Sequence, residues 1–325
     1  MNPTLKKYLK IILPILLGVF LIGYSLSKVP LSELLAYFKN ANYFYIALGM
    51  FFGLLSHLSR SYRWLFQLEP MGYKVRFANS FMAVFSAYLI NYTIPRAGEV
   101  ARASILTTYE GVPFEKGFGS IVAERFADLI MLLIIIGITL LLQFDYIASF
   151  FMERFNPKNL LIYLLMAIFL LGIFIFYIRK SKAGFGLKIK NFIKGLAEGA
   201  LSIFKMEKKW AFLFHTVFIW TMYVLMFYTT TFSVQALSGI TLGAILIGFI
   251  SATFSIAATN GGIGSYPIAI YAAFSIFAIP EAPSIAFGWI IWTSQTLLII
   301  LFGGLSLLYL PIFNGNKVPH QIDSK

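Results

Sequence analysis

The sequence contains no cysteine, only three histidines and few charged residues. Without cysteine, disulfides, thiol catalysis and thiolate metal sites are excluded. His57, His215 and His320 show no metal-ligand spacing, so we expect neither a metal nor a cofactor. Charged residues make up 12% of the 325 residues, whereas hydrophobic residues make up 59%. A soluble domain could not bury so much apolar surface, and we therefore predict an all-α, polytopic membrane protein.

The net charge of +13 would by itself suggest a nucleic-acid partner. The cations, however, stand beside apolar segments, as in cytoplasmic loops that touch anionic lipid. We therefore expect membrane lipids and no nucleic acid as partners, in a bacterial inner membrane with both termini cytoplasmic. A homodimer, or a membrane partner that supplies energy or substrate, is also considered.

Apolar segments predict about six full spans within a single transmembrane domain, 1–325. The basic amino terminus resembles a signal peptide but has no small-residue cleavage site, which predicts an uncleaved first span. Residues 31–38 have the alternation of a short interfacial helix. Residues 186–205 place apolar positions opposite lysines, which predicts a basic amphipathic helix on an anionic surface. The predicted spans are residues 8–26, 43–64, 117–144, 160–178, 210–237 and 284–310.

Residues 77–107 are predicted to form a re-entrant helical hairpin. An uncharged segment stops at Pro95, and proline ends a helix at the preceding residue. If each apolar segment crossed once, the basic connection 179–209 would lie outside the cell, against the positive-inside rule. A hairpin in this place leaves few cations outside, namely Lys28, Lys39, Arg154 and Lys158.

Residues 242–279 are predicted to form a second re-entrant hairpin, which turns at the glycine-rich segment Asn260–Gly264. It would enter from the opposite face, so the two hairpins suggest an inverted repeat. Transporters bind substrate at such helix breaks, where irregular backbone lines a cavity.

Ionisable residues concentrate at the first hairpin and the span after it. Their charges cancel, so one interpretation is an internal ion-pair network that pins the hairpin against span four. The other is a substrate role, because intramembrane ionisable groups commonly mark transport paths. These residues are Arg96, Glu99, Arg102, Glu124, Arg125 and Asp128.

His57, Arg60 and Arg63 share one helical face at the end of the second span. One interpretation is a basic membrane end, where arginines extend toward water. The other is a phosphate-binding face, since guanidinium groups bind phosphate through paired donors.

The segment Asn260-Gly261-Gly262-Ile263-Gly264 is not a dinucleotide fingerprint, because no strand precedes it. Its glycines permit a tight turn and close helix packing, which is an alternative to ligand contact. The candidate substrate-binding residues are Arg60, Arg63, Asn91, Arg96, Glu99, Arg102, Glu124, Arg125, Asp128, Asn260, Gly261, Gly262 and Gly264.

In these motifs the chain resembles the lysylphosphatidylglycerol synthase/flippase transmembrane family, which includes the membrane part of the multiple peptide resistance factor. The resemblance covers nearly the whole chain and implies a flippase-like domain that moves lipids between leaflets. The aminoacyl-transferring soluble domain of the family is not expected, since the chain stops soon after Leu310. The matching pieces are Arg60-x-x-Arg63-Trp64, Asn91-x-x-x-Pro95-Arg96-x-Gly98-Glu99-x-x-Arg102, Glu124-Arg125-x-x-Asp128 and Gly261-Gly262-x-Gly264.

Three functions follow from these observations. The first is a lipid translocator, in which a headgroup passes the charged residues while its tails stay in the bilayer; with no nucleotide motif, ATP would require a partner. The second is a membrane enzyme or accessory subunit acting on a lipid-linked substrate, with Glu99, Glu124 or Asp128 as acid or base. We find no nucleophile–base pair, so we expect no enzyme. The third is a scaffold subunit whose polar network is structural.

Overall fold

The computed structural model describes residues 3–94, 97–146, 148–149, 157–180, 186–187 and 206–315. The chain divides into two compact units, Met1–Glu124 with Trp210–Lys325, and Arg125–Lys209. Each unit is described by itself. The predicted break at Pro95, the site candidate Arg96 and nearly all of the predicted amphipathic helix 186–205 lie outside the described residues.

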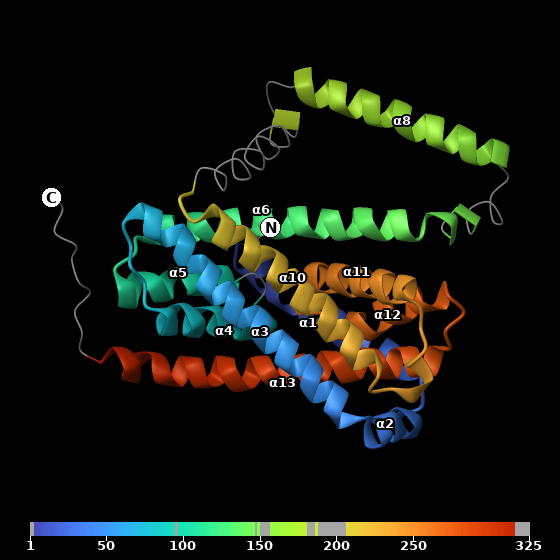
Figure 1. The fold of residues 1–325 in the computed structure, drawn as a ribbon, viewed down its shortest axis with the longest axis horizontal. Helices are drawn as coiled ribbons and strands as arrows, with labels where there is room; N and C mark the ends of the chain where they lie inside the picture. The colour runs from blue at the N-terminus through green and yellow to red at the C-terminus, as the bar shows by residue number, and fades with distance from the viewer. Residues whose placement is uncertain are drawn as a thin grey trace. The chain divides into compact units, whose positions relative to one another are not determined.

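Every regular element in the described ranges is a helix, which confirms the predicted all-α class (Figure 1). Two short 3-10 helices, Glu69–Met71 and Gln235–Leu237, precede the two pairs of shorter helices. The α-helices are α1 (Pro3–Lys28), α2 (Leu31–Asn40), α3 (Tyr43–Leu68), α4 (Phe77–Thr93), α5 (Ala97–Glu110), α6 (Phe114–Leu142), α8 (Pro157–Lys180), α10 (Lys209–Thr231), α11 (Leu242–Ala258), α12 (Ser265–Ser275) and α13 (Glu281–Asn314).

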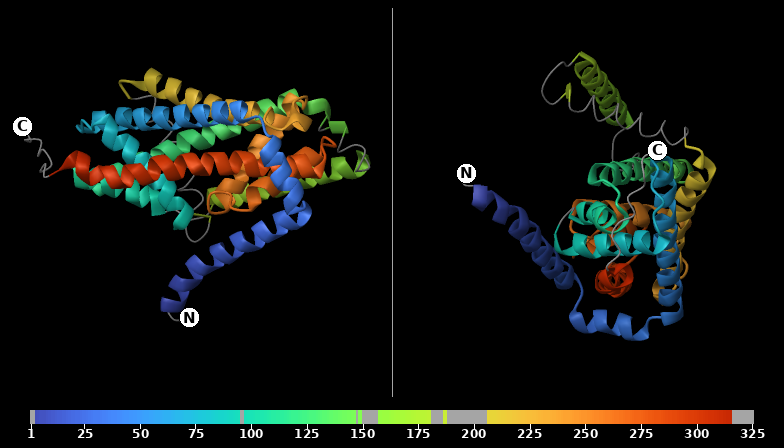
Figure 2. Two further views of the ribbon diagram at one scale, coloured as in Figure 1. Left: turned by 90° about the horizontal axis from the view of Figure 1, so that it is seen from below. Right: turned by 90° about the vertical axis from the view of Figure 1, so that its left-hand side faces the viewer.

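The helices are those of a multi-pass membrane protein. Among the described residues, α6, α10 and α13 are each long and apolar enough to cross a bilayer, and α1 with α2 makes a fourth candidate that bends by 83° (Figure 2). This is fewer than the six predicted spans. The predicted span 43–64 is present as α3, but its second half carries polar residues such as Ser56 and Arg60, which are buried in protein. Leucines such as Leu141 and Leu308 are more than two-thirds exposed instead, as expected of a surface that faces lipid.

Helices α4 and α5 form an antiparallel hairpin. At the turn, the Gly98 amide donates to Asn91 Oδ1 over 2.8 Å, and a Cβ at Gly98 would collide with the carbonyl oxygen of Ala87. At the other end, the Asn79 side chain at the start of α4 donates to the Glu110 carboxylate at the end of α5. The hairpin occupies the predicted place and continues three residues beyond position 107.

Helices α11 and α12 form a second antiparallel hairpin. The hydroxyl oxygens of Ser255 and Ser265 lie 2.6 Å apart near the turn. Further from the turn, a Cβ at Gly248 would lie only 2.6 Å from the Phe274 ring. The helical parts of this hairpin end at Ser275, four residues before the predicted limit.

Helix α13 runs past both hairpins, which lie along different halves of its length (Figure 1). Its 34 residues span about 51 Å, more than the apolar thickness of a bilayer. In its first half, a Cβ at Gly288 would lie 2.5 Å from Pro267 of the second hairpin. In its second half, Gly303 packs on Leu89, and Asn314 donates to Asn79 at the base of the first hairpin over 3.0 Å. The two hairpins therefore extend toward each other from opposite ends of α13.

The same order of elements occurs twice: a long helix, a hairpin and a long helix, first as α3 to α6 and then as α10 to α13. The first helices of the two sets, α3 and α10, run antiparallel. Ser59 near the end of α3 bonds His215 near the start of α10 over 2.7 Å. At the opposite end of the pair, Gly49 packs on Thr230. Opposed hairpins and antiparallel first helices have the arrangement of the predicted inverted repeat. Whether each hairpin re-enters from one membrane face stays a prediction.

Candidate functional site

Glu124 is the centre of a buried charged cluster at the first hairpin. It lies on α6 and is fully buried. Its Oε1 atom pairs with the guanidinium groups of Arg60, and of Arg63 at 3.3 Å, both from α3. Its Oε2 atom accepts from Arg102 Nη2 of α5 over 3.0 Å. One carboxylate thus joins three helices of the first unit, and we call these four residues the arginine cluster.

The burial of Arg60 and Arg63 bears on the two interpretations of this face. Their exposed fractions are 2% and 0%, so neither side chain extends toward water as a membrane-end arginine would. Being three residues apart on α3, both point to the same side of the helix and reach the same carboxylate. Arginines that extend toward water at a membrane end would not be buried in this way.

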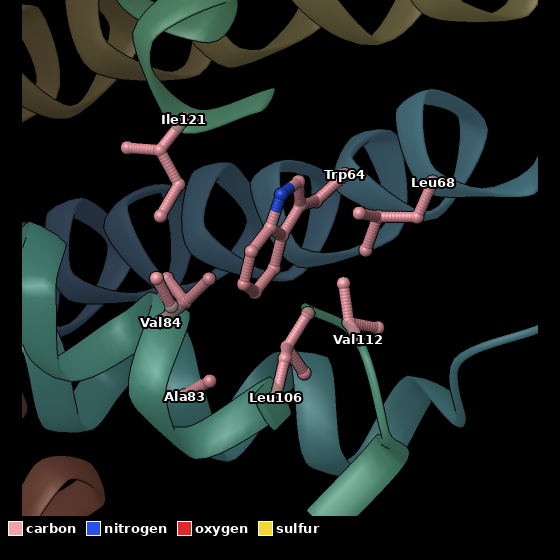
Figure 3. Packing of buried hydrophobic residues seen from close by; sticks show 8 residues of the cluster. Trp64, Leu68, Ala83, Val84, Leu106, Val112 and Ile121 are labelled. Carbon is pink, nitrogen blue, oxygen red and sulfur yellow. The ribbon is translucent and has the colours of Figure 1, made fainter. Parts of the chain in front are cut away.

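Trp64 holds the Arg102 guanidinium in a fixed orientation. The centre of that guanidinium lies 3.8 Å from the centroid of the Trp64 ring, a cation–π contact. The indole Nε1 donates to Ser120 Oγ over 2.8 Å, which ties α3 to α6. Figure 3 shows this ring packed among apolar side chains, including Val84 and Leu106 of the first hairpin.

Arg63 also contacts α10. Its Nη1 donates to Thr216 Oγ1 over 2.8 Å, and its guanidinium lies 5.2 Å from the Phe212 ring centroid. Thr216 in turn donates to the Phe212 carbonyl over 2.8 Å. These contacts come from a helix more than 150 residues away in sequence, so no local pattern could have predicted them.

The arginine cluster has the chemistry of an anion site. Each guanidinium carries five N–H donors in a fixed plane, a geometry that matches phosphate oxygens. Three of them converge on one carboxylate, and so cations outnumber acids among these four side chains. Burying such charges costs free energy, and buried ion pairs are weak evidence of stabilisation alone. Intramembrane ionisable groups commonly mark functional sites, and binding of an anionic ligand would offset this cost.

The other described charged candidates are Glu99, Arg125 and Asp128. Glu99 is partly buried on α5, three residues before Arg102. Arg125 and Asp128 belong to the second unit, where they form an ion pair of 3.6 Å. Arg125 is 43% exposed and Asp128 10% exposed at their side chains, so this pair is open on one side.

The predicted hairpin-turn residues have mainly backbone roles. Asn91 caps the start of α5 through its bond to the Gly98 amide. Gly261, Gly262 and Gly264 all have positive φ values, from 63° to 79°. Gly264 also lies so close to the backbone of α1 that a Cβ would collide with Ile22. The packing interpretation of these glycines is therefore supported.

The two hairpin turns meet beside the middle of α13. A Cβ at Gly261 would lie 2.7 Å from the Tyr92 ring at the end of α4. Trp292 Nε1 of α13 donates to the Gly261 carbonyl over 2.8 Å, and Thr296 Oγ1 donates to Tyr92 Oη over 3.2 Å. Sequence reasoning missed Tyr92, Trp292 and Thr296. The only signal was that Tyr92 immediately follows the candidate Asn91.

Among the residues that the structure describes, no group of three His, Asp or Glu side chains could hold a metal ion. The cluster itself combines three arginines with one acid, a set suited to anions rather than cations.

Comparisons with known proteins agree with this architecture. The model of a family described as the lysylphosphatidylglycerol synthase TM region matches residues 11–304. A UPF0104 membrane protein of Methanocaldococcus jannaschii is 25% identical over 287 residues, which cover 80% of this chain and 82% of that protein. The glycosyltransferase AglD of Haloferax volcanii is 24% identical over 140 residues, which cover 43% of this chain and 22% of that protein.

Proposed function

We propose a function on the premise that this chain belongs to the lysylphosphatidylglycerol synthase transmembrane-region family: it moves a phosphate-bearing lipid headgroup between the two leaflets of its membrane. The observation that carries the proposal is the pair of opposed hairpins that meet half-way along α13. In transporters, broken helices of this kind surround the substrate site near the middle of the bilayer.

The arginine cluster supplies the chemistry for the headgroup. A phosphate that enters from the side of the first hairpin would exchange its hydration for guanidinium donors of Arg60, Arg63 and Arg102. Glu124 keeps these donors oriented and balances part of their charge when no headgroup is bound. The acyl tails would stay in the bilayer, so only the polar headgroup needs a protein path.

Purified protein in liposomes with an acyl-labelled fluorescent phosphatidylglycerol tests this proposal. Dithionite is added outside the liposomes, and the loss of fluorescence measures how fast labelled lipid reaches the outer leaflet. We expect Arg102→Gln to slow transfer by about tenfold or more, because a charge-assisted phosphate contact is lost. Arg76→Gln is the matched control: this arginine pairs with Glu110 at 2.8 Å, is 38% exposed and lies outside the cluster. We expect it to change the rate by less than about twofold.

Equal rates for protein-containing and protein-free liposomes would contradict the proposal. A second experiment with soluble glycerol phosphate tests whether the cluster binds a free phosphate compound. If it stabilises the protein while no lipid moves, the cluster binds a solute instead of a lipid headgroup.

A second candidate function is an accessory role for an enzyme that acts on a lipid-linked substrate. The similarity to part of a protein named glycosyltransferase favours it. In that role the chain would present the lipid-linked substrate to a catalytic partner. Turnover of such a substrate in the presence of the partner, with no redistribution of labelled lipid, would support this role over translocation.

A further inference from the structure

His57 is a buried histidine among aromatic side chains of the described residues. It is 6% exposed and is surrounded by the rings of Phe85, Tyr88 and Tyr223, at centroid distances of 5.1, 4.7 and 6.2 Å. Within the described part of the chain, its buried Nδ1 atom has no hydrogen-bond partner. A buried polar atom of this kind costs free energy, and so it calls for an explanation.

Two more buried polar atoms without a partner in the described residues lie nearby. Gln295 Nε2 of α13 is one of them, and this side chain packs against Gly53, one helical turn before His57 on α3. The other is Trp220 Nε1 of α10; its ring contacts Tyr223, which in turn contacts His57. Helices α3, α10 and α13 thus each carry one such atom in the region of the protein around His57.

This region lies between the arginine cluster and the point where the hairpins meet. Arg60 follows His57 by three residues on α3, so both lie on one face. In the other direction, Gln295 is followed by Thr296, which bonds Tyr92 at the turn of the first hairpin. From Arg60 to Gly53 the distance along α3 is about 10 Å, comparable to the length of a small headgroup.

We propose that His57 and Gln295 bind the part of the lipid headgroup that lies beyond the phosphate. This inference rests on the proposed function, because the phosphate has to occupy the arginine cluster. It assigns a substrate class: phospholipids whose headgroup carries a hydroxyl or ammonium group next to the phosphate ester. A headgroup without such a group leaves both side chains unsatisfied and is disfavoured, as in sites built to bond a substrate hydroxyl.

Two lipids of equal charge test the inference in the same liposome assay. Phosphatidylglycerol carries hydroxyls beyond the phosphate, whereas phosphatidylethanol carries only a short alkyl group. We expect the wild-type protein to move phosphatidylglycerol about tenfold faster, the value of one hydrogen bond to a buried group. His57→Phe, which fills the same space without a nitrogen, should lower the ratio of phosphatidylglycerol to phosphatidylethanol transfer several-fold, because only Gln295 then remains to bond the headgroup. His57→Asn should restore part of it, because its amide lies close to the position of Nδ1.

His215→Phe is the matched control. His215 also lies among aromatic rings, but it bonds Ser59 over 2.7 Å and lies away from the path toward the hairpin turns. This variant should keep the preference for phosphatidylglycerol. Equal transfer of the two lipids by wild-type protein, or an undiminished preference in His57→Phe, would overturn the inference while the translocator function stands. If wild-type protein moves neither lipid, the proposed function and this inference fail together.

Discussion

Glu124 shows most clearly how single residues determine the candidate site. Its two carboxylate oxygens face three guanidinium groups that come from two other helices, and none of the four side chains is more than 3% exposed. In a low-dielectric interior each of these charges depends on the others, because an isolated buried charge is strongly disfavoured. Loss of the one acid therefore affects all three arginines.

We predict that Glu124→Gln lowers the free energy of unfolding by about 3–5 kcal/mol, the usual cost of removing one partner from a buried ion pair. Unfolding in mixed detergent, followed by circular dichroism, measures this. The matched control is Glu281→Gln, because Glu281 pairs with Lys28 at 3.7 Å and both side chains are about one-third exposed. The control should unfold like the wild-type protein. Similar unfolding of all three proteins would show that the stability of the arginine cluster does not depend on Glu124.

The sequence predicted much of the site at the level of residue identity but little of its pairing. Charges in apolar segments singled out Arg102 and Glu124, and helical spacing placed Arg60 and Arg63 on one face. The pairing itself joins residues up to 64 positions apart, and it depends on how α3, α5 and α6 pack. Helix periodicity carries no information on such packing.

At the scale of elements, glycines set how closely α13 packs against the first hairpin. Gly303 and Gly304 are adjacent on α13 but face different surroundings. A Cβ at Gly303 would lie 2.8 Å from the Phe85 carbonyl oxygen and from Leu89, whereas a Cβ at Gly304 would meet no described atom within 4 Å. A backbone oxygen cannot move aside as a flexible side chain can.

We predict that Gly303→Ala lowers the midpoint of thermal unfolding, because α13 has to move away from the hairpin. Gly304→Ala should leave the midpoint unchanged or raise it slightly, since alanine favours a helix over glycine by about 1 kcal/mol. Differential scanning fluorimetry of the two variants measures the contrast. A larger loss for Gly304→Ala would mean that the described packing of α13 is incorrect.

The hairpins were largely predictable from sequence, but their meeting point was not. A proline, a glycine-rich turn and the distribution of cations located both breaks. The contact of Tyr92 with Gly261 and the bond from Trp292 to Gly261 join segments that no motif relates. Among the described residues, α3 is not counted as a candidate span, because it buries polar residues inside the protein and is less apolar than a lipid-facing helix.

For the molecule as a whole, we propose that two hairpins enter the membrane from opposite faces and meet within it. The described contacts place the hairpins along opposite halves of α13. With the basic loop before α4 inside and the first hairpin returning to that side, the three predicted spans 117–144, 160–178 and 210–237 would put the loop before α11 outside. In the proposed function, this arrangement would give each leaflet a route toward the same central region.

The side of the membrane on which each loop lies can be measured with single cysteines in the two loops that precede the hairpins. The chain has no cysteine of its own that would react. Lys74 before α4 and Ser238 before α11 are both exposed, so Lys74→Cys and Ser238→Cys form a matched pair. Each variant is treated in intact cells with a maleimide that cannot cross the membrane. We predict that Ser238→Cys is labelled in intact cells and that Lys74→Cys is labelled only after the membrane is opened. Labelling of both from the same side would contradict opposed hairpins and the translocation path built on them.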